Sequence, residues 1–155
     1  MVSLEWRAIQ NQTRVRFWPV AGYTDRHTEY RSNALTHSLM IVDDSRVSRM
    51  MIRARIQAVH PDWTFVEAAS GDEAVDMVAQ NPPDSLTMDM NMPGLNGFDA
   101  AEKVKALAPS VKMVMLTANI QESSRQRAEA MGMKFVQKPI TDASIQQVLA
   151  FLAET

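Results

Sequence analysis

Residues 39–45 read Leu-Met-Ile-Val-Asp-Asp-Ser, four apolar residues followed directly by two carboxylates. A short apolar run of this kind is typical of a buried strand, and the acidic pair marks the point where the strand ends. Further apolar runs follow at residues 63–68, 84–88, 112–116 and 134–137. Stretches of helical period separate and follow these runs, at residues 45–59, 71–80, 97–107, 121–131 and 142–153.

The last helical stretch shows the pattern on which these assignments depend. Its apolar residues Ile145, Val148, Leu149 and Leu152 are spaced i, i+3, i+4 and i+7, so they form one stripe along a helix. Strands that alternate with helices run parallel, with right-handed crossovers that cover both faces of a sheet. The sequence therefore predicts an α/β fold: a doubly wound, five-stranded parallel sheet with five helices.

Composition narrows the class of protein. The 155 residues are 46% hydrophobic and carry a net charge of -2 with no cysteine. These values exclude a disulfide scaffold and a protein that coats nucleic acid. No apolar run approaches the roughly 18 residues of a membrane span, and the N-terminus lacks a secretory signal. We expect a cytoplasmic protein that contacts neither nucleic acid nor membrane directly.

The first 36 residues differ from the rest. They contain five arginines, three acidic residues and several aromatic residues, but no apolar period persists among them. We interpret 1–36 as an irregular N-terminal arm outside a domain at 37–155. It is either a disordered extension or the product of a start-site error, with translation beginning near Leu35; contact of its Arg and Trp residues with a partner is the alternative.

Polar residues follow four of the five predicted strands. They are Asp43 and Asp44, then Asp89, Thr117 and Lys138. Because the carboxyl ends of parallel strands meet at one edge of the sheet, we expect these side chains to converge. Three crowded carboxylates repel one another unless a cation joins them, and oxygen ligands favour Mg²⁺. An ammonium and a hydroxyl beside the ion suit the oxygens of a phosphoryl group.

Four motifs carry a resemblance to a known family. Residues 41–45 read Ile-Val-Asp-Asp-Ser, and residues 87–94 read Thr-Met-Asp-Met-Asn-Met-Pro-Gly. Residues 115–118 read Met-Leu-Thr-Ala, and residues 136–139 read Val-Gln-Lys-Pro. In this order and spacing they resemble the CheY-like receiver domain of two-component response regulators over about residues 38–154. The resemblance implies a flavodoxin-like sheet of strand order 2-1-3-4-5 and a cis peptide bond before the proline.

The resemblance also assigns roles in the site. It implies that Asp89 accepts a phosphoryl group from a sensor histidine kinase or a phosphotransfer protein. Asp44 and Asp89 would ligate Mg²⁺ directly, Asp43 largely through water, and Asn91 through its backbone carbonyl. Thr117 and Lys138 would hold the phosphoryl oxygens. Such a protein catalyses only its own phosphorylation and dephosphorylation, and is not a conventional enzyme.

The same resemblance implies how phosphorylation would be passed on to a target protein. Thr117 and Phe135 would form the switch, with the aromatic ring packing inward behind the threonine. A downstream protein target would bind the face formed by residues 121–131, 134–137 and 142–153. Because the sequence stops at Thr155, we expect a stand-alone receiver of the chemotaxis or phosphorelay type, monomeric or dimerising on phosphorylation.

Two other functions remain open at this point. One is a receiver-like docking module that is never phosphorylated. The other is an aspartyl-nucleophile phosphatase, which would need a second acid two residues after the nucleophile, where this chain has Asn91. The methionines on predicted helices and strands are interpreted as flexible core filling: Met50, Met51, Met77, Met88, Met113 and Met115.

Overall fold

The computed structural model describes residues 36–118 and 121–154. The predicted arm at 1–36 therefore lies outside the described residues except for its last position. Among the helices of the described part of the chain, none has the length and apolar character needed to cross a membrane.

Strands and helices alternate along the described chain. The strands are β1 (Ser38–Val42), β2 (Thr64–Ala68), β3 (Ser85–Asp89), β4 (Lys112–Thr117) and β5 (Lys134–Gln137). The helices are α2 (Arg46–Val59), α3 (Gly71–Gln80), α4 (Gly97–Leu107), α5 (Glu122–Ala130) and α6 (Asp142–Ala153). The ten predicted segments are confirmed, each to within one residue at either end.

The five strands form one parallel sheet in the order β2-β1-β3-β4-β5, which confirms the predicted order. In register, Val42 lies beside Ala68 on one side and Met88 on the other. Asp89 lies beside Leu116, and Thr117 beside Gln137. The last residues of the inner strands therefore lie at the same edge of the sheet, where the polar side chains follow.

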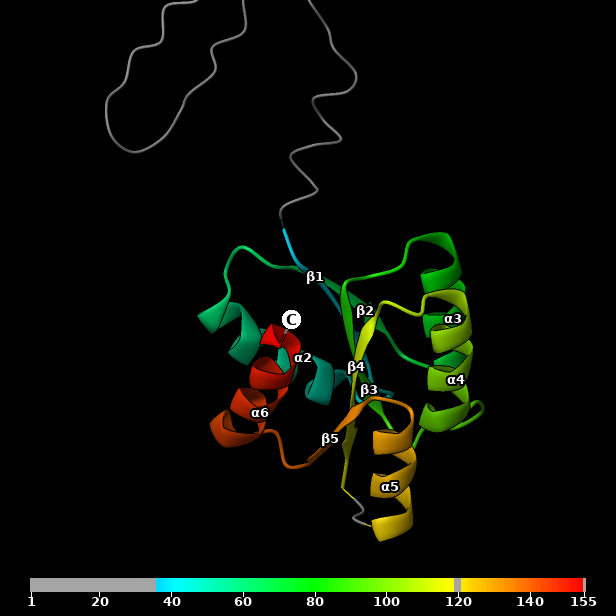
Figure 1. Ribbon diagram of the computed structural model, residues 1–155. Coiled ribbons are helices and arrows are strands. Elements are labelled where there is room, and N and C mark those ends of the chain that lie inside the picture. Colours follow the sequence, from blue (N-terminus) through cyan, green and yellow to red (C-terminus); the bar gives the residue numbers. More distant parts are fainter. Residues whose placement is uncertain (1–35, 119–120, 155) are drawn as a thin grey trace, which may run out of the picture. The chain divides into compact units, whose positions relative to one another are not determined.

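Helices cover both faces of the sheet (Figure 1). Helices α2 and α6 lie on one face, and α3, α4 and α5 on the other. Each face has its own apolar cluster, because alternate residues of a strand point to opposite faces. Leu39 and Ile41 belong to the cluster under α2 and α6, whereas Met40 and Val42 belong to the other. All four side chains are essentially inaccessible to solvent, as expected for strands buried on both faces.

Side chains cap four of the helices at their N-termini. Ser45, Ser70, Asn96 and Thr141 each accept a hydrogen bond from a backbone N–H one turn into the helix, which satisfies a donor that has no partner within the helix. Helix α5 differs, because Gln121 at its N-cap makes no such bond. Within Glu122–Ala130, all of which is described, only Ala128 is buried. This helix is therefore held to the domain by little apolar contact.

The prediction that Met50 and Met51 are buried is wrong. Met50 is 56% exposed and Met51 39% exposed, whereas Met88, Met113 and Met115 lie in the core as expected and Met77 is partly buried. Helix α2 turns Ile52 and Ile56 toward the sheet. The two methionines lie on its outer side, so helical spacing alone misplaced them.

One buried polar group lacks a partner. Thr87, in the middle of β3, is inaccessible to solvent, and its Oγ1 has no hydrogen-bond partner among residues 36–118 and 121–154. In register it lies between Ile41 and Val114. Burying a hydroxyl without a partner costs about 1–3 kcal/mol.

Thr87→Val should therefore stabilise the fold, because valine has nearly the same shape and removes the unsatisfied hydroxyl. We expect the free energy of unfolding, measured by urea denaturation, to rise by about 1 kcal/mol. Thr64→Val, at an exposed position of β2, should change it by less than about 0.5 kcal/mol. A loss of stability in Thr87→Val would show that the hydroxyl has a partner in solution.

Candidate functional site

Three carboxylates meet at the carboxyl edge of the sheet. Asp43 follows β1, Asp44 comes next, and Asp89 is the last residue of β3. One carboxylate oxygen from each lies within 4.8 Å of the other two. Asp43 and Asp89 are buried, with 1% and 6% of their surface exposed, whereas Asp44 is exposed. The structure therefore brings together the three acids that the sequence predicted to converge.

Lys138 is the cation of this cluster. Its Nζ lies 2.7 Å from Asp43 Oδ2 and 3.3 Å from Asp89 Oδ1. Burial disfavours the ammonium, but the hydrogen bond and charge of Asp43, with those of Asp89, outweigh burial and raise the pKa of Lys138 above its ordinary value. The amine is therefore charged at neutral pH and partly neutralises the two buried acids.

The backbone holds Lys138 at this position. Its N–H donates to the carbonyl of Thr117 at 2.8 Å, which ties the end of β5 to the end of β4. The peptide bond between Lys138 and Pro139 is cis, as expected. Thr117 is itself fully buried. The threonine and the lysine predicted to act together are thus neighbours across two strand ends.

Asp89 is in an unfavourable environment for a negative charge. Burial raises the pKa of its carboxyl above the ordinary value, and the charge of Asp43 adds to this. The charge of Lys138 acts in the opposite direction, as does a hydrogen bond from the Asn91 backbone N–H, but the net shift in pKa is upward. A cation bound beside Asp89 would relieve this repulsion.

The loop after β3 packs too closely for a side chain at Gly97. A Cβ at that position would lie 2.3 Å from the carbonyl oxygen of Asp89 and 2.8 Å from Cα of Met90. Gly97 therefore lets the N-terminus of α4 approach the backbone of Asp89. Asn96 caps that helix by accepting from Asp99 N–H, so the residues that follow Asp89 in the sequence also fix its backbone.

The donor set suits a hard divalent cation. The three carboxylates offer only oxygen atoms. Asp44 is exposed, so the cluster is open to solvent on one side rather than a closed cage. Mg²⁺ prefers oxygen ligands and usually keeps several waters, so it needs only one or two carboxylates directly. The residues present therefore fit Mg²⁺.

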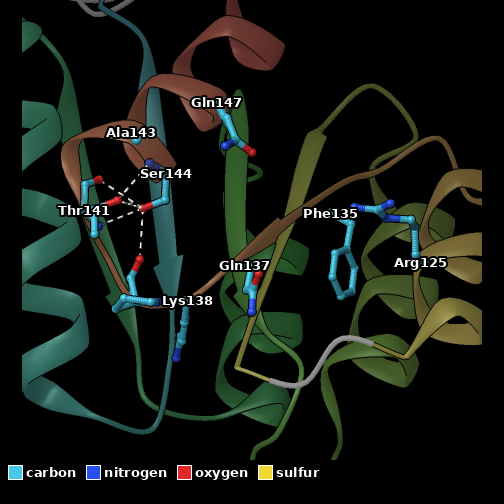
Figure 2. A pocket seen from close by; sticks show the side chains of 9 residues that line it. Arg125, Phe135, Gln137, Lys138, Thr141, Ala143, Ser144 and Gln147 are labelled. Carbon is cyan, nitrogen blue, oxygen red and sulfur yellow. Dashed lines mark hydrogen bonds between the residues drawn. The ribbon is translucent and has the colours of Figure 1, made fainter.

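The predicted switch residue Phe135 lies in β5. It is 7% exposed and belongs to the apolar cluster on the α3, α4 and α5 face. It also lines a pocket of about 420 Å³ that extends from α5 across β5 to α6, and to which Arg125, Gln137, Lys138 and Gln147 contribute (Figure 2). Lys138 therefore belongs both to the acidic site and to the wall of this pocket.

Sequence reasoning missed one residue of the site. Arg49, in the first turns of α2, donates to the backbone carbonyl of Asp43 at 2.7 Å. Glu67, the next-to-last residue of β2, accepts from the same guanidinium at 3.0 Å. The available signal was the spacing of Arg49, one helical turn after the Ser45 cap, which places it over the strand ends.

The fold and the acidic strand edge define the class: a doubly wound α/β protein that collects three carboxylates and a lysine at the carboxyl ends of its strands. A family model, described as the response regulator receiver domain, matches residues 39–150. The chain belongs to this family.

Known proteins are similar to this chain in sequence and in fold. Chemotaxis protein CheY of Thermotoga maritima is 32% identical over 112 residues, covering 72% of this chain and 92% of that protein. The sensor kinase/phosphatase LuxN of Vibrio harveyi is 28% identical over 76% of this chain, but the match is 14% of its length. The response regulator domain of Thermotoga maritima CheB is 28% identical, with a TM-score of 0.66 over 76% of this chain and 93% of that structure.

Asp89→Asn should stabilise the folded protein slightly in metal-free buffer at pH 7. A raised carboxyl pKa in the folded state means that ionisation costs stability above that pKa, and the cost disappears as pH falls through it toward the ordinary value. The gain from Asn should therefore shrink between pH 7 and pH 4, measured by urea denaturation with a chelator present.

Asp62→Asn, at an exposed position after α2, is the matched control and should leave the free energy of unfolding unchanged at each pH. A larger stabilisation by Asp89→Asn at acid pH than at pH 7 would contradict the assigned direction of the pKa shift.

Proposed function

We propose that the chain accepts a phosphoryl group on Asp89 in a Mg²⁺-dependent reaction and thereby changes its binding to a downstream protein. One observation carries the proposal: Asp89, buried and with a raised pKa, has two other carboxylates within 4.8 Å and the Lys138 ammonium at 3.3 Å. Phosphoryl transfer needs positioning and charge compensation, and this cluster offers both.

The proposed roles of the residues are those that the resemblance to the receiver family gives to these positions. A carboxylate oxygen of Asp89 attacks phosphorus in the donor, the bond from phosphorus to the donor's nitrogen or oxygen breaks, and an aspartyl acyl phosphate remains. Lys138 shifts its contact from Asp89 to a phosphoryl oxygen and neutralises its charge. The Thr117 hydroxyl donates to another phosphoryl oxygen. Asp44, Asp89 and the Asn91 carbonyl would hold Mg²⁺, with Asp43 acting largely through water. When bound, the ion would supply positive charge to the carboxylates and the phosphoryl group.

The donor is a phosphohistidine on a sensor histidine kinase or a phosphotransfer protein. Family membership supports this donor class, as do relatives that are themselves sensor kinases, among them RcsC of Salmonella typhi at 26% identity over 75% of this chain. The histidine leaves as a neutral imidazole when its second ring nitrogen is protonated in the phosphohistidine, so no further proton donor is needed for transfer to the carboxylate.

The output passes through β5. Thr117 moves toward the phosphoryl group, and Phe135 fills the space behind it and reshapes the pocket between α5 and α6. A protein target, of the chemotaxis or phosphorelay type, binds the surface formed by α5, β5 and α6. The support is that Phe135 and Lys138 both line that pocket, so one change at the site reaches the surface through a single strand.

Acetyl phosphate, a small phosphoryl donor, tests the acceptor directly. We expect intact-protein mass spectrometry to detect one added phosphoryl group in the wild type with Mg²⁺ and none without it. Asp89→Asn should gain none, because the amide is not a nucleophile, while Asp62→Asn should behave as wild type. Substantial phosphorylation of Asp89→Asn would mean that another residue is the acceptor. Absence of wild-type phosphorylation, together with no beryllofluoride binding, would support the docking-module alternative.

Lys138→Ala should still accept the phosphoryl group, at a rate lower by about a hundredfold, because charge compensation is lost. It should also fail to switch. The measurement is the change in amide chemical shifts of α5 and β5 on beryllofluoride or phosphoryl addition, which we expect in the wild type and not in the variant.

Lys134→Ala removes an exposed lysine from the same strand and should switch normally. If Lys138→Ala showed the wild-type shift changes, Lys138 would not link the site to the surface.

A further inference from the structure

Arg49 is a largely buried cation beside the acidic site. The proposed phosphoryl chemistry does not use it. Only 14% of its side chain is exposed. Its Nη1 donates to the backbone carbonyl of Asp43 at 2.7 Å, and its Nε donates to Glu67 Oε2 at 3.0 Å. The guanidinium therefore bridges the acidic loop after β1 and the C-terminal end of β2.

The other polar groups of Asp43 have separate partners. Its N–H donates to Ala68 O at 3.2 Å, Oδ1 accepts from Ser45 N–H at 2.8 Å, and Oδ2 accepts from Lys138. The carbonyl that Arg49 holds belongs to the peptide unit joining Asp43 to Asp44. Because that peptide is planar, fixing its carbonyl fixes the direction in which the chain enters Asp44.

Of the three acids, Asp44 is the one whose carboxylate has the fewest other restraints. Its carboxylate is exposed, whereas those of Asp43 and Asp89 are held by Lys138 and by burial. An exposed carboxylate gains a fixed place among the metal-binding oxygens only through its backbone. The contact from Arg49 to the preceding carbonyl provides that restraint.

Glu67 holds the guanidinium in place from the sheet. It lies beside Ile41 in the register of β1 and β2, and it also accepts from Arg53 Nη1 at 3.4 Å. The Arg53 guanidinium lies 5.7 Å from the centre of the Phe65 ring, although 46% of its side chain is exposed. Arg49 is thus fixed at one end by a paired carboxylate and reaches the acidic loop with the other.

We propose that Arg49 is a positioning residue: anchored by Glu67, it orients the Asp43–Asp44 peptide so that Asp44 is ready to ligate the divalent cation. This inference rests on the proposed function, because it concerns the same metal-binding carboxylates. Arg49 does not touch the cation. It acts through the backbone of a neighbouring residue.

Charge and geometry predict opposite effects, which makes the inference testable. A positive charge near three carboxylates repels a divalent cation, so removing the charge alone should tighten metal binding. Loss of the backbone restraint should weaken it, and groups that orient metal ligands are typically worth at least about tenfold in affinity. The sign of the change in metal affinity therefore distinguishes an effect of the Arg49 charge from an effect of the backbone restraint.

The experiment measures Mn²⁺ affinity of the full chain by electron paramagnetic resonance, and Mg²⁺ affinity by competition. Arg49→Gln removes the charge and the forked contact, while Arg49→Lys keeps the charge but replaces the planar fork with a single ammonium. We expect both to lose about tenfold in affinity. Arg46→Gln removes an exposed arginine from the same end of α2 and should bind as tightly as the wild type or more tightly.

Urea denaturation with a chelator checks that each variant is folded, and Arg49→Lys provides the test if Arg49→Gln does not fold. Unchanged affinity in Arg49→Lys together with tighter binding in Arg49→Gln would show that Arg49 acts only through its charge and would overturn the inference. A merely structural role would lower the free energy of unfolding in both variants and leave the metal affinity of the folded protein unchanged, which would also overturn it.

A double-mutant cycle with Glu67→Gln tests whether Glu67 acts by holding the Arg49 guanidinium in place. If Glu67 acts by holding Arg49, the losses in metal affinity of Arg49→Gln and Glu67→Gln should not add, and the double variant should resemble Arg49→Gln. Independent charges would instead give opposite effects that cancel in the double variant, which would contradict the inference.

Asp44→Asn separates this inference from the proposed function. Metal binding in the wild type that is lost in Asp44→Asn supports the carboxylate site, whatever Arg49 does. If the wild type binds neither Mn²⁺ nor Mg²⁺, the Mg²⁺-dependent function fails and the role of Arg49 fails with it.

Discussion

Two buried carboxylates beside one ammonium are the constraint on which this structure depends. Asp43 and Asp89 are almost fully buried, and each lies within ion-pair distance of Lys138. Burying a carboxylate without a partner costs several kcal/mol, so the ends of three strands have to meet at the lysine. The pKa of Asp89 is still raised, which shows that one ammonium does not fully compensate for burial and for the second acid. The site is therefore short of positive charge, which a bound divalent cation would supply.

Much of this arrangement could be predicted from the sequence. Most of the apolar runs are short because both faces of the sheet are covered, and four of the five are followed directly by a polar residue. That pattern gives the strands, the parallel sheet and the common edge where Asp43, Asp89, Thr117 and Lys138 lie. The strand order came instead from resemblance to the receiver family, because periodicity shows which residues form strands and does not show which strands are neighbours.

Other features depend on contacts that no local pattern encodes. The bridge from Arg49 to Asp43 and Glu67 joins residues of a helix, a loop and a strand, and it forms only once β1 and β2 pair in register. Met50 and Met51 were misplaced for a similar reason. Helix α2 has apolar residues on two sides, and only its packing through Ile52 and Ile56 decides which side is buried.

The polar character of α5 bears on how the proposed switch could reach the surface. Apart from Ala128, its side chains are not buried, and its links to α4 include the ion pair of Arg127 with Glu102 and the contact of that guanidinium with the Phe98 ring, 4.6 Å from its centre. An exposed ion pair contributes little free energy, and segments with few buried apolar contacts move at low cost. Lys138 is tied to the acids at one end of β5, and Phe135 lies three residues earlier beside α5. A small displacement of β5 therefore meets a helix that resists it weakly, whereas α6 is held by Ile145, Val148 and Leu152. Of the two helices that border the pocket, α5 is the one whose movement would alter the surface.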